Sequence, residues 1–303
     1  MTTPVAVLAP VAVNLLGVVE HPTMDGGPYR IDADGRPYVP VGDGGIVLGL
    51  ALGDPVFGLA ADHAAPGACL VHPDPAARHA LATYACIGNP VTVRTGRAAG
   101  VHGAVAGKRG EDGRVITVFR PGDLAGMRPG DQVSVRSCGQ GYQPPGLPAG
   151  VVMMNADPGL LGLLPSVQFS PGGGAADGAA GDGAATGGAG PALAVGVRCV
   201  VPSKLAGNGL GRPAASWDID LQLAPGPEVR LGDLVAVTGL DARWNMGYRR
   251  GFVTVGVVVH GSSPQPGHGP GITPILSGPA AALAVTPDVG GHVGLTATAL
   301  KLQ

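Results

Sequence analysis

Glycine and proline interrupt this chain so often that its apolar runs stay short. The 303 residues include 54 glycines and 30 prolines, and outside one Gly/Ala-rich tract these residues separate runs of Val, Leu and Ile. Such spacing is typical of short strands joined by turns rather than of disorder. Hydrophobic residues make up 45% of the chain but aromatic residues only 4%, so the core must be aliphatic. We therefore expect a β-rich α+β fold with few helices.

Two similar segments lie far apart in the chain. Met127-Arg-Pro-Gly-Asp-Gln-Val-Ser-Val-Arg and Val229-Arg-Leu-Gly-Asp-Leu-Val-Ala-Val-Thr each place a Gly-Asp turn before an alternating strand. That pattern is common in small β-barrels. We expect two β-barrel- or sandwich-like halves, an N-terminal domain at residues 1–148 and a C-terminal domain at residues 149–303.

Local signals predict one clear helix and one clear hairpin. Asp74 suits the N-cap and Pro75 the first helical position, and the apolar residues that follow share one face. This helix is expected near residues 75–87, because Gly88-Asn-Pro stops it. The Asp34-Gly35 pair, flanked by strand-forming residues, predicts a hairpin over residues 29–39.

The composition changes at residues 170–190, which are almost entirely Gly, Ala and Asp. Such a tract cannot bury enough apolar surface to offset the entropy lost on ordering. We expect a flexible, disordered-like insertion there.

Charge and cysteine usage exclude several classes of function. The formal net charge is -2 with no long basic run, which argues against nucleic-acid binding. The first residues lack the basic region of a signal peptide, and no apolar run reaches the ~20 residues of a membrane span. Four scattered cysteines form neither a zinc motif nor a disulfide framework. We expect a cytoplasmic protein with free thiols.

The strongest candidate for a site is the Asp62-His63 pair. It lies between apolar runs and just before the Pro66-Gly67 turn, so two ionisable side chains are delivered close to a core. Burial there can shift their pKa values, as it does in many functional sites. An ordinary buried Asp-His pair is the alternative interpretation.

Two later segments carry further chemistry. The alternation of Ser216-Trp-Asp-Ile-Asp-Leu would place Asp218 and Asp220 on one strand face and Trp217 on the other. The apolar run Val253–Val259 predicts a buried strand that ends at His260, and His268 follows in a Gly-rich loop. We expect these residues to meet Asp62 and His63 in one site between the halves. The hypothesis fails if the pair lies more than ~15 Å from both His260 and Asp218, far beyond the reach of acid/base catalysis.

Three classes of function fit these residues. Two His and one or two Asp could bind a divalent metal and activate water, as in a hydrolase of a small polar amide or ester. Without a metal, a carboxylate or His could act as a base while cations hold an anionic group of the substrate. A non-enzymatic oligomeric assembly protein is the third class. Because the possible ligands lack a short spacing motif, the sequence slightly favours the metal-free enzyme and assigns no cofactor, although a divalent metal stays open.

The candidate residues divide by expected role. The catalytic candidates are Asp62, His63, Asp218 and His260. The substrate-binding candidates are Trp217, Asp220, Tyr248, Arg249, Arg250 and His268. No residue is assigned to a metal.

Several segments together resemble a bacterial domain-of-unknown-function family of about this length, with two β-rich parts. They are Gly42-Asp-Gly-Gly, Ala61-Asp-His-Ala-Ala-Pro-Gly, Tyr84-Ala-Cys-Ile-Gly-Asn, Asn155-Ala-Asp-Pro, Gly247-Tyr-Arg-Arg-Gly and Gly267-His-Gly-Pro-Gly. The resemblance covers nearly the whole chain apart from the Gly/Ala tract, and such a family implies no activity.

More narrowly, the chain is similar to the larger subunit of the aziridine-forming, sulfate-eliminating enzymes of azinomycin-type antibiotic biosynthesis. That resemblance implies a lyase or cyclase in which a neighbouring amine of an amino-acid substrate displaces a sulfate ester. It also implies a smaller partner subunit in a hetero-oligomer. Asp62 or His63 would then be the base, and Arg249, Arg250 or His268 would meet the departing sulfate.

Overall fold

A computed structural model gives the fold. It describes residues 9–24, 27–110, 113–170, 192–225, 228–288, 290 and 293–302. The flexible insertion predicted at residues 170–190 lies, apart from residue 170, outside the described residues. The described part of the chain is β-rich with a few short helices, as expected, and none of its helices is long and apolar enough to cross a membrane.

The first half of the chain forms a closed antiparallel barrel. Its sheet has the order β1-β9-β6-β7-β8-β5-β4, and β1 also pairs with β5, so six of the strands close on themselves. The strands are β1 (Ala12–Val19), β4 (Ile46–Val47), β5 (Gly67–Val71), β6 (Pro90–Val93), β7 (His102–Arg109), β8 (Arg114–Val118) and β9 (Gln132–Cys138). Valines fill much of the interior, and Leu81 of helix α1 (Pro75–Tyr84) packs against them.

The second half is also β-rich but is built from an open sheet and a smaller one. The larger sheet has the order β10-β17-β16-β15-β13, and β14 pairs with β17. Its strands are β10 (Val152–Met153), β13 (Cys199–Pro202), β14 (Ile219–Asp220), β15 (Leu234–Asp241), β16 (Gly247–His260) and β17 (Gly271–Pro279). The smaller sheet joins β11 (Val167–Ser170), β12 (Ala192–Val197) and β18 (Leu283–Pro287).

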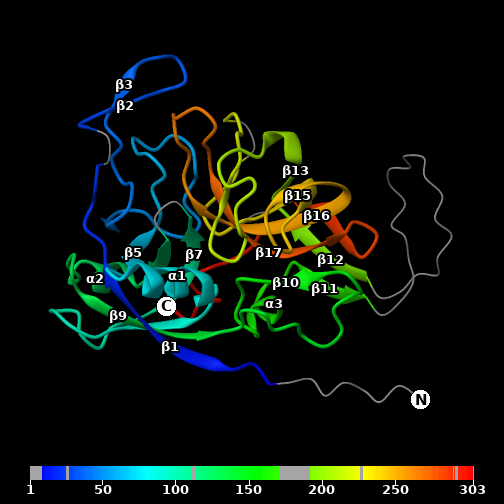
Figure 1. Cartoon of the computed structure of the whole chain (residues 1–303), viewed down its shortest axis with the longest axis horizontal. Helices are drawn as coiled ribbons and strands as arrows, with labels where there is room; N and C mark the ends of the chain where they lie inside the picture. Colours follow the sequence, from blue (N-terminus) through cyan, green and yellow to red (C-terminus); the bar gives the residue numbers. More distant parts are fainter. Residues whose placement is uncertain are drawn as a thin grey trace.

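A short hairpin and three short helical segments complete the described elements. The hairpin pairs β2 (Arg30–Ile31) with β3 (Pro37–Tyr38) and projects from the top of the molecule in Figure 1. The helical segments are α2 (Pro121–Leu124), α3 (Leu160–Leu163) and the 3-10 turn η1 (Ser203–Leu205).

Local sequence signals correspond closely to these elements. The Asp74 side chain accepts a hydrogen bond from the Ala77 N–H at 2.8 Å, and α1 begins at Pro75 as predicted. The helix ends at Tyr84, before the predicted residue 87, because Ala85 already has extended backbone angles. The Asp34-Gly35 hairpin is also confirmed.

The two Gly-Asp turns are built in the same way. Asp131 accepts a hydrogen bond from the Arg128 N–H at 2.8 Å, and Asp233 accepts one from the Arg230 N–H at 2.8 Å. Each turn leads directly into a long strand, β9 or β15.

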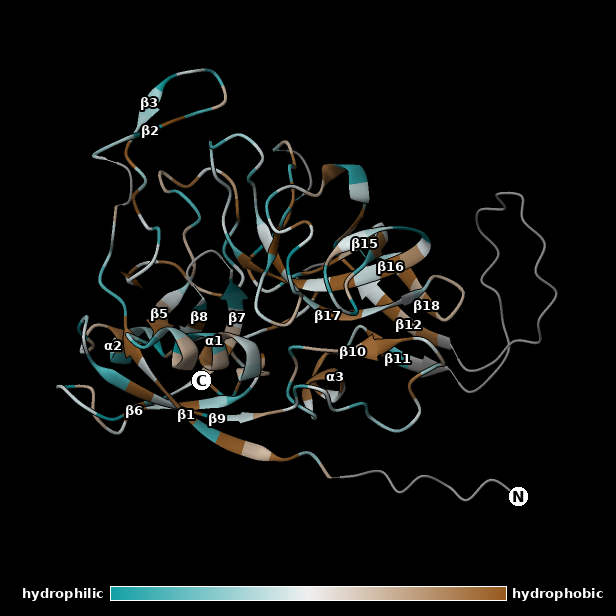
Figure 2. Cartoon of the chain, in the orientation of Figure 1, coloured by the Kyte–Doolittle hydropathy of each residue, from teal (hydrophilic) through white to brown (hydrophobic). Residues whose placement is uncertain are grey.

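The two halves share one hydrophobic core. A single cluster of buried residues includes Ile116 of the barrel together with Val255 and Ile275 of the second sheet. The Thr273 side chain of β17 is also bonded to the backbone of β7, since the Lys108 N–H donates to Thr273 Oγ1 at 3.0 Å. Brown, hydrophobic stretches mark strands such as β5, β10 and β16 in Figure 2. The boundary expected at residue 148 stays a prediction.

Candidate functional site

The structure brings together six of the residues that the sequence singled out. Asp62 and His63 come from the loop before β5, and His268 from the loop before β17. Asp218 and Asp220 lie at β14, and His260 ends β16. The ring centroids of His63 and His260 are 5.1 Å apart, and those of His63 and His268 are 4.9 Å apart. The pair therefore lies well within the distance that the hypothesis required.

Strand register at Gly271 explains why Asp220 and His260 meet. Gly271 is the direct partner of Asp220 across β14–β17 and of His260 across β16–β17. A side chain at Gly271 could not be accommodated, because a Cβ there would lie 2.0 Å from His260 Nε2. Glycine at this position thus permits the side chains of Asp220 and His260 to approach each other.

The backbone fixes His63 from both sides. Its φ angle is 50°, a left-handed conformation that non-glycine residues seldom adopt. Its N–H donates to the Ser262 carbonyl at 3.2 Å, while the Asp62 N–H donates to Val41 at 2.8 Å. Such conformations cluster at functional sites, where the surrounding structure holds them.

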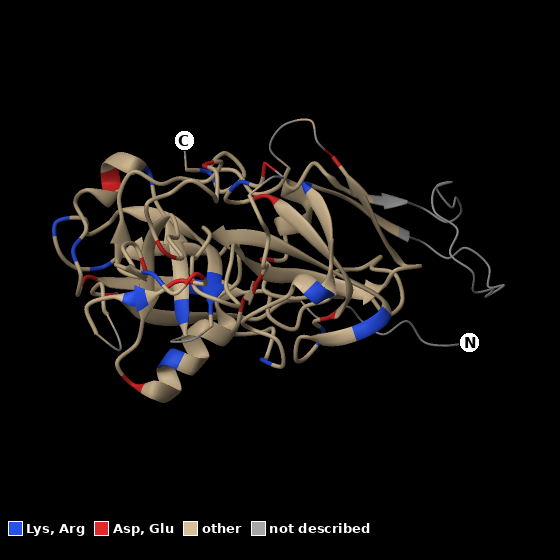
Figure 3. Ribbon diagram, turned by 90° about the horizontal axis from the view of Figure 1, so that it is seen from above, with Lys and Arg blue, Asp and Glu red and all other residues tan. Residues whose placement is uncertain are grey.

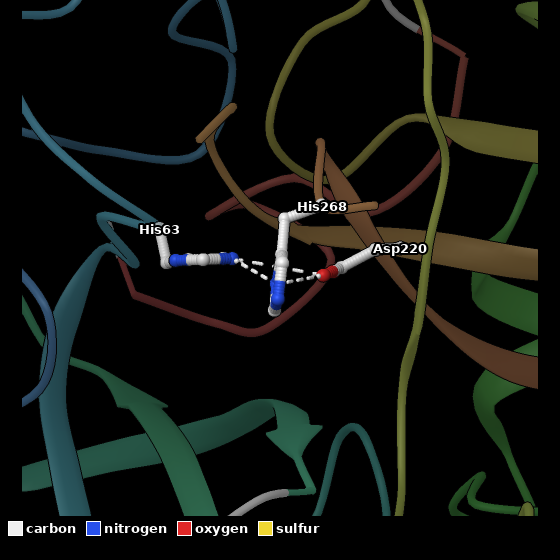
Figure 4. A group of neighbouring side chains, drawn as sticks. All are labelled: His63, Asp220 and His268. Carbon is white, nitrogen blue, oxygen red and sulfur yellow. Dashed lines mark hydrogen bonds and ion pairs between the residues drawn. The ribbon is translucent and has the colours of Figure 1, made fainter. Parts of the chain in front are cut away.

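Three atoms that could coordinate a metal ion form the centre of the cluster (Figure 4). His63 Nε2 is 3.0 Å from His268 Nδ1, and Asp220 Oδ2 is 2.8 Å from His268 Nδ1 and 3.6 Å from His63 Nε2. Asp220 Oδ2 is buried and, among the described residues, no donor is aligned with it for a hydrogen bond. The three atoms therefore converge on a shared point.

His260 is fully buried and contacts the other carboxylate oxygen of Asp220, Oδ1. Its Nδ1–H donates to the Gly261 carbonyl at 2.9 Å, and its Nε2 lies 2.8 Å from Asp218 Oδ2 and 3.2 Å from Asp220 Oδ1. Burial opposes the charged imidazole, but the two carboxylates outweigh this and raise the pKa of His260 to about 10. Burial would likewise raise the pKa of Asp220, but its contacts with His260 and His268 hold that pKa well below its usual range.

Asp62 is held by the hairpin, on the outer side of His63. Its Oδ2 accepts from Arg30 at 3.0 Å and from the Tyr38 hydroxyl at 3.0 Å, and its Oδ1 lies 2.7 Å from His63 Nδ1. Burial would raise the pKa of Asp62, but contacts with His63, Ser263 and Tyr38 hold it well below its usual range. Arg30 also pairs with buried Asp43 at 3.0 Å.

Sequence reasoning did not find these supporting residues. Arg30 and Tyr38 are direct partners in the predicted hairpin, so the hairpin itself was the available signal. Asp43 lies in a Gly-rich turn and pairs with Arg109 of β7, a contact between segments far apart in the sequence.

Four other predicted residues lie outside this cluster or at its margin. Tyr248, Arg249 and Arg250 are exposed at the opposite end of β16, roughly 33–40 Å of extended strand from His260. Arg249 pairs with Asp241 at 3.0 Å and lies over the Phe252 ring. The length of β16 therefore separates these residues from the site.

Trp217 lies at the margin and does not join the polar cluster. It packs against the backbone of Gly110, where a Cβ would lie 2.1 Å from its ring, and Arg212 stacks 4.8 Å from its ring centroid. The next residue, Asp218, contacts the N–H of the same Gly110 through Oδ1 and lies against His260 through Oδ2.

A cleft of about 510 Å³ adjoins the cluster on the Asp62 side. Its lining includes Tyr38, which contacts Asp62, and Ala61, which precedes it. Among the described residues, the lining contains no Asp, Glu, Lys or Arg. Figure 3 shows blue and red segments interspersed along the chain rather than gathered into one basic face.

Family models assign the chain. The N-terminal domain model of DUF4438, a domain of unknown function, matches residues 29–162, and the C-terminal domain model matches residues 186–294. The chain belongs to the DUF4438 family. Its fold is similar to the crystal structure of TM1086, with 29% identity, a TM-score of 0.82 and coverage of 93% of this chain and 95% of that chain. No curated protein matches this DUF4438 chain.

Proposed function

We propose that this DUF4438 protein is a metal-dependent hydrolase of a small polar amide or ester. The observation that carries the proposal is the convergence of His63 Nε2, His268 Nδ1 and Asp220 Oδ2, with separations of 2.8 to 3.6 Å. Donor atoms that each lie about 2.1 Å from one ion are separated by about 3 Å, as these are. This geometry is the reason to prefer a metal over the metal-free chemistry that the sequence slightly favoured.

The ligand types suit a catalytic metal. Two imidazoles and one carboxylate suit Zn²⁺ and related divalent ions and leave coordination positions open. A divalent metal held there would polarise a carbonyl group and lower the pKa of a coordinated water.

Asp62 and His260, which contact the proposed ligands, are placed to support a metal site. His63 turns its other nitrogen toward the Asp62 carboxylate, and Asp220 turns its other oxygen toward His260. A carboxylate partner such as Asp62 orients a ligating imidazole and makes it more basic, and hydrogen bonds to a ligating carboxylate such as Asp220 likewise orient it.

The cleft adjoins the cluster, although none of the three proposed ligands lines it, and its surface favours one kind of substrate. Apolar groups and the hydroxyls of Tyr38, Ser262 and Ser263 line it, and no charged side chain is among the described residues that do so. Such a surface suits a neutral molecule with hydrogen-bonding groups better than an anionic one. Hydrolysis of a neutral amide or ester is therefore favoured over elimination of sulfate.

Metal analysis tests the proposal. Protein purified without chelator is expected to hold at least one divalent metal per chain, counted by inductively coupled plasma mass spectrometry, and to hydrolyse members of an amide and ester panel. His268→Ala should lose that metal and the activity, while His79→Ala, on the exposed face of α1, should keep both. Wild-type protein that neither retains metal nor takes up added Zn²⁺ would reject the proposal.

The same preparation tests the alternative. The Asp62–His63 contact at 2.7 Å favours a role as base in aziridine formation, which needs no metal. Sulfate release from amino-acid sulfate esters that resists EDTA, alone or with a smaller partner subunit, would favour that reaction.

A further inference from the structure

We propose that a second divalent metal ion binds between Asp218, Asp220 and His260, with Asp220 bridging the two ions. This inference rests on the proposed function and makes the site a two-metal centre. The first ion contacts Asp220 Oδ2, and the second contacts Asp220 Oδ1.

The atoms that would bind the second ion contact one another, while the second polar atom of His260 and of Asp218 contacts the backbone. His260 uses its Nδ1–H on the Gly261 carbonyl, so Nε2 remains. Asp218 accepts the Gly110 N–H at 2.9 Å through Oδ1, so Oδ2 remains. These remaining atoms are 2.8 Å apart, and Asp220 Oδ1 lies 3.2 Å from His260 Nε2. A backbone acceptor behind a ligating histidine is the usual support at metal sites.

Gly271 leaves space beside these atoms. A Cβ there would lie 2.0 Å from His260 Nε2 and 2.6 Å from Asp218 Oδ2. Any other residue at position 271 would fill the volume next to the donor atoms. Glycine is thus required on the strand that both Asp220 and His260 pair with.

Charge also favours a cation at this position. Among the described residues, the ion pairs of Asp218 and Asp220 are formed with histidines rather than with Arg or Lys. Two buried carboxylates therefore lie together with imidazole partners. A divalent cation bound to His260 Nε2 in place of a proton would add net positive charge beside them.

The two donor sets are close enough to act together. They share Asp220, and the rings of His63 and His260 lie edge to face at 5.1 Å. Two-metal enzymes hold their ions about 3.5–4 Å apart, so that one ion activates the nucleophile while the other stabilises the developing negative charge. Hydrolysis of a neutral amide or ester needs both an activated nucleophile and stabilisation of the negative charge that develops, and two ions supply one each.

Zinc stoichiometry tests the inference. Chelator-treated wild-type protein, titrated with Zn²⁺ and desalted, is expected to retain two ions per chain. His260→Gln should retain one and Asp220→Asn fewer than one, while His79→Ala should retain two. Circular dichroism would verify that each variant is folded.

Electron paramagnetic resonance of the wild-type protein tests the second site without relying on the folding of any variant. Protein loaded with two equivalents of Mn²⁺ should give an exchange-coupled electron paramagnetic resonance spectrum rather than that of isolated ions. One zinc per chain, or uncoupled Mn²⁺ at full loading, would overturn the second site and leave the proposed function intact. No bound metal would overturn both.

Discussion

Lys108 is fully buried although, in the described part of the chain, the acceptors of its ammonium group are neutral. Its Nζ donates to the Thr83 carbonyl at 2.9 Å, to Asn155 Oδ1 at 2.8 Å and to the Ala215 carbonyl at 2.5 Å. Burial lowers the pKa of Lys108 to about 8 from 10.5. The unfolded chain therefore binds a proton more tightly than the folded one, and stability rises with pH between these two values.

The expected result is a pH-dependent difference between wild type and Lys108→Met. The cost of burying the charge is complete below about pH 8 and declines as pH rises toward 10.5. Between pH 7.5 and 9.5 the wild type should gain about 2 kcal/mol of unfolding free energy relative to the variant. Urea denaturation at several pH values measures this, with exposed Lys301→Met as control. A constant difference would contradict it.

Individual site residues could be predicted where a local rule placed them. Asp62, His63 and His260 each follow or precede an apolar run, and the spacing of Asp218 and Asp220 predicted that they lie together. The distance of Arg249 from the cluster could not be predicted, because the sequence does not show at which end of a long strand the other candidates lie. The role of Arg30 could not be predicted, because its contact with Asp62 spans 32 residues.

At the scale of elements, the β2–β3 hairpin depends on the site as much as the site depends on it. Two residue pairs are too few for an independent hairpin. Contacts of Arg30 and Tyr38 with Asp62, and the Ala33 N–H bond to Pro264 at 3.1 Å, attach it to the body. The same contacts hold Asp62 against His63.

Arg30→Ala should therefore loosen the hairpin and the metal site together. We expect faster hydrogen exchange in residues 30–38 and a loss of about 10–100-fold in Zn²⁺ affinity, as for other partners of metal ligands. Arg36→Ala is the matched control, since Arg36 is exposed and pairs with exposed Asp34. Unchanged affinity in Arg30→Ala would show that the hairpin does not orient His63.

Elements defined by neighbouring residues were predictable, and those defined by distant pairing were not. The cap at Asp74, the Asp34-Gly35 hairpin and the Gly-Asp turns all act within a few residues. Closure of the barrel by β1–β5 and the meeting of β14 and β16 at Gly271 depend on long-range register. A single sequence carries no direct record of such pairing.

At the scale of the whole molecule, the three proposed metal ligands come from both halves. His63 belongs to the barrel half, whereas Asp220 and His268 belong to the second half. Their separations of about 3 Å can be maintained only if the halves form one rigid unit. The shared core that contains Ile116 and Val255 provides that unit.

A destabilising substitution on the barrel side of this core should therefore lower the stability of both halves. Ile116→Ala removes a side chain with no exposed surface and should cost about 2–5 kcal/mol. Hydrogen-exchange protection should fall equally in β8, which contains Ile116, and in β16 of the other half, because both open in the same global unfolding event. Leu163→Ala, a half-exposed position on α3, should leave both unchanged. If β16 kept its protection while β8 lost it, the halves would unfold separately, and the site geometry would need a source of rigidity other than the common core.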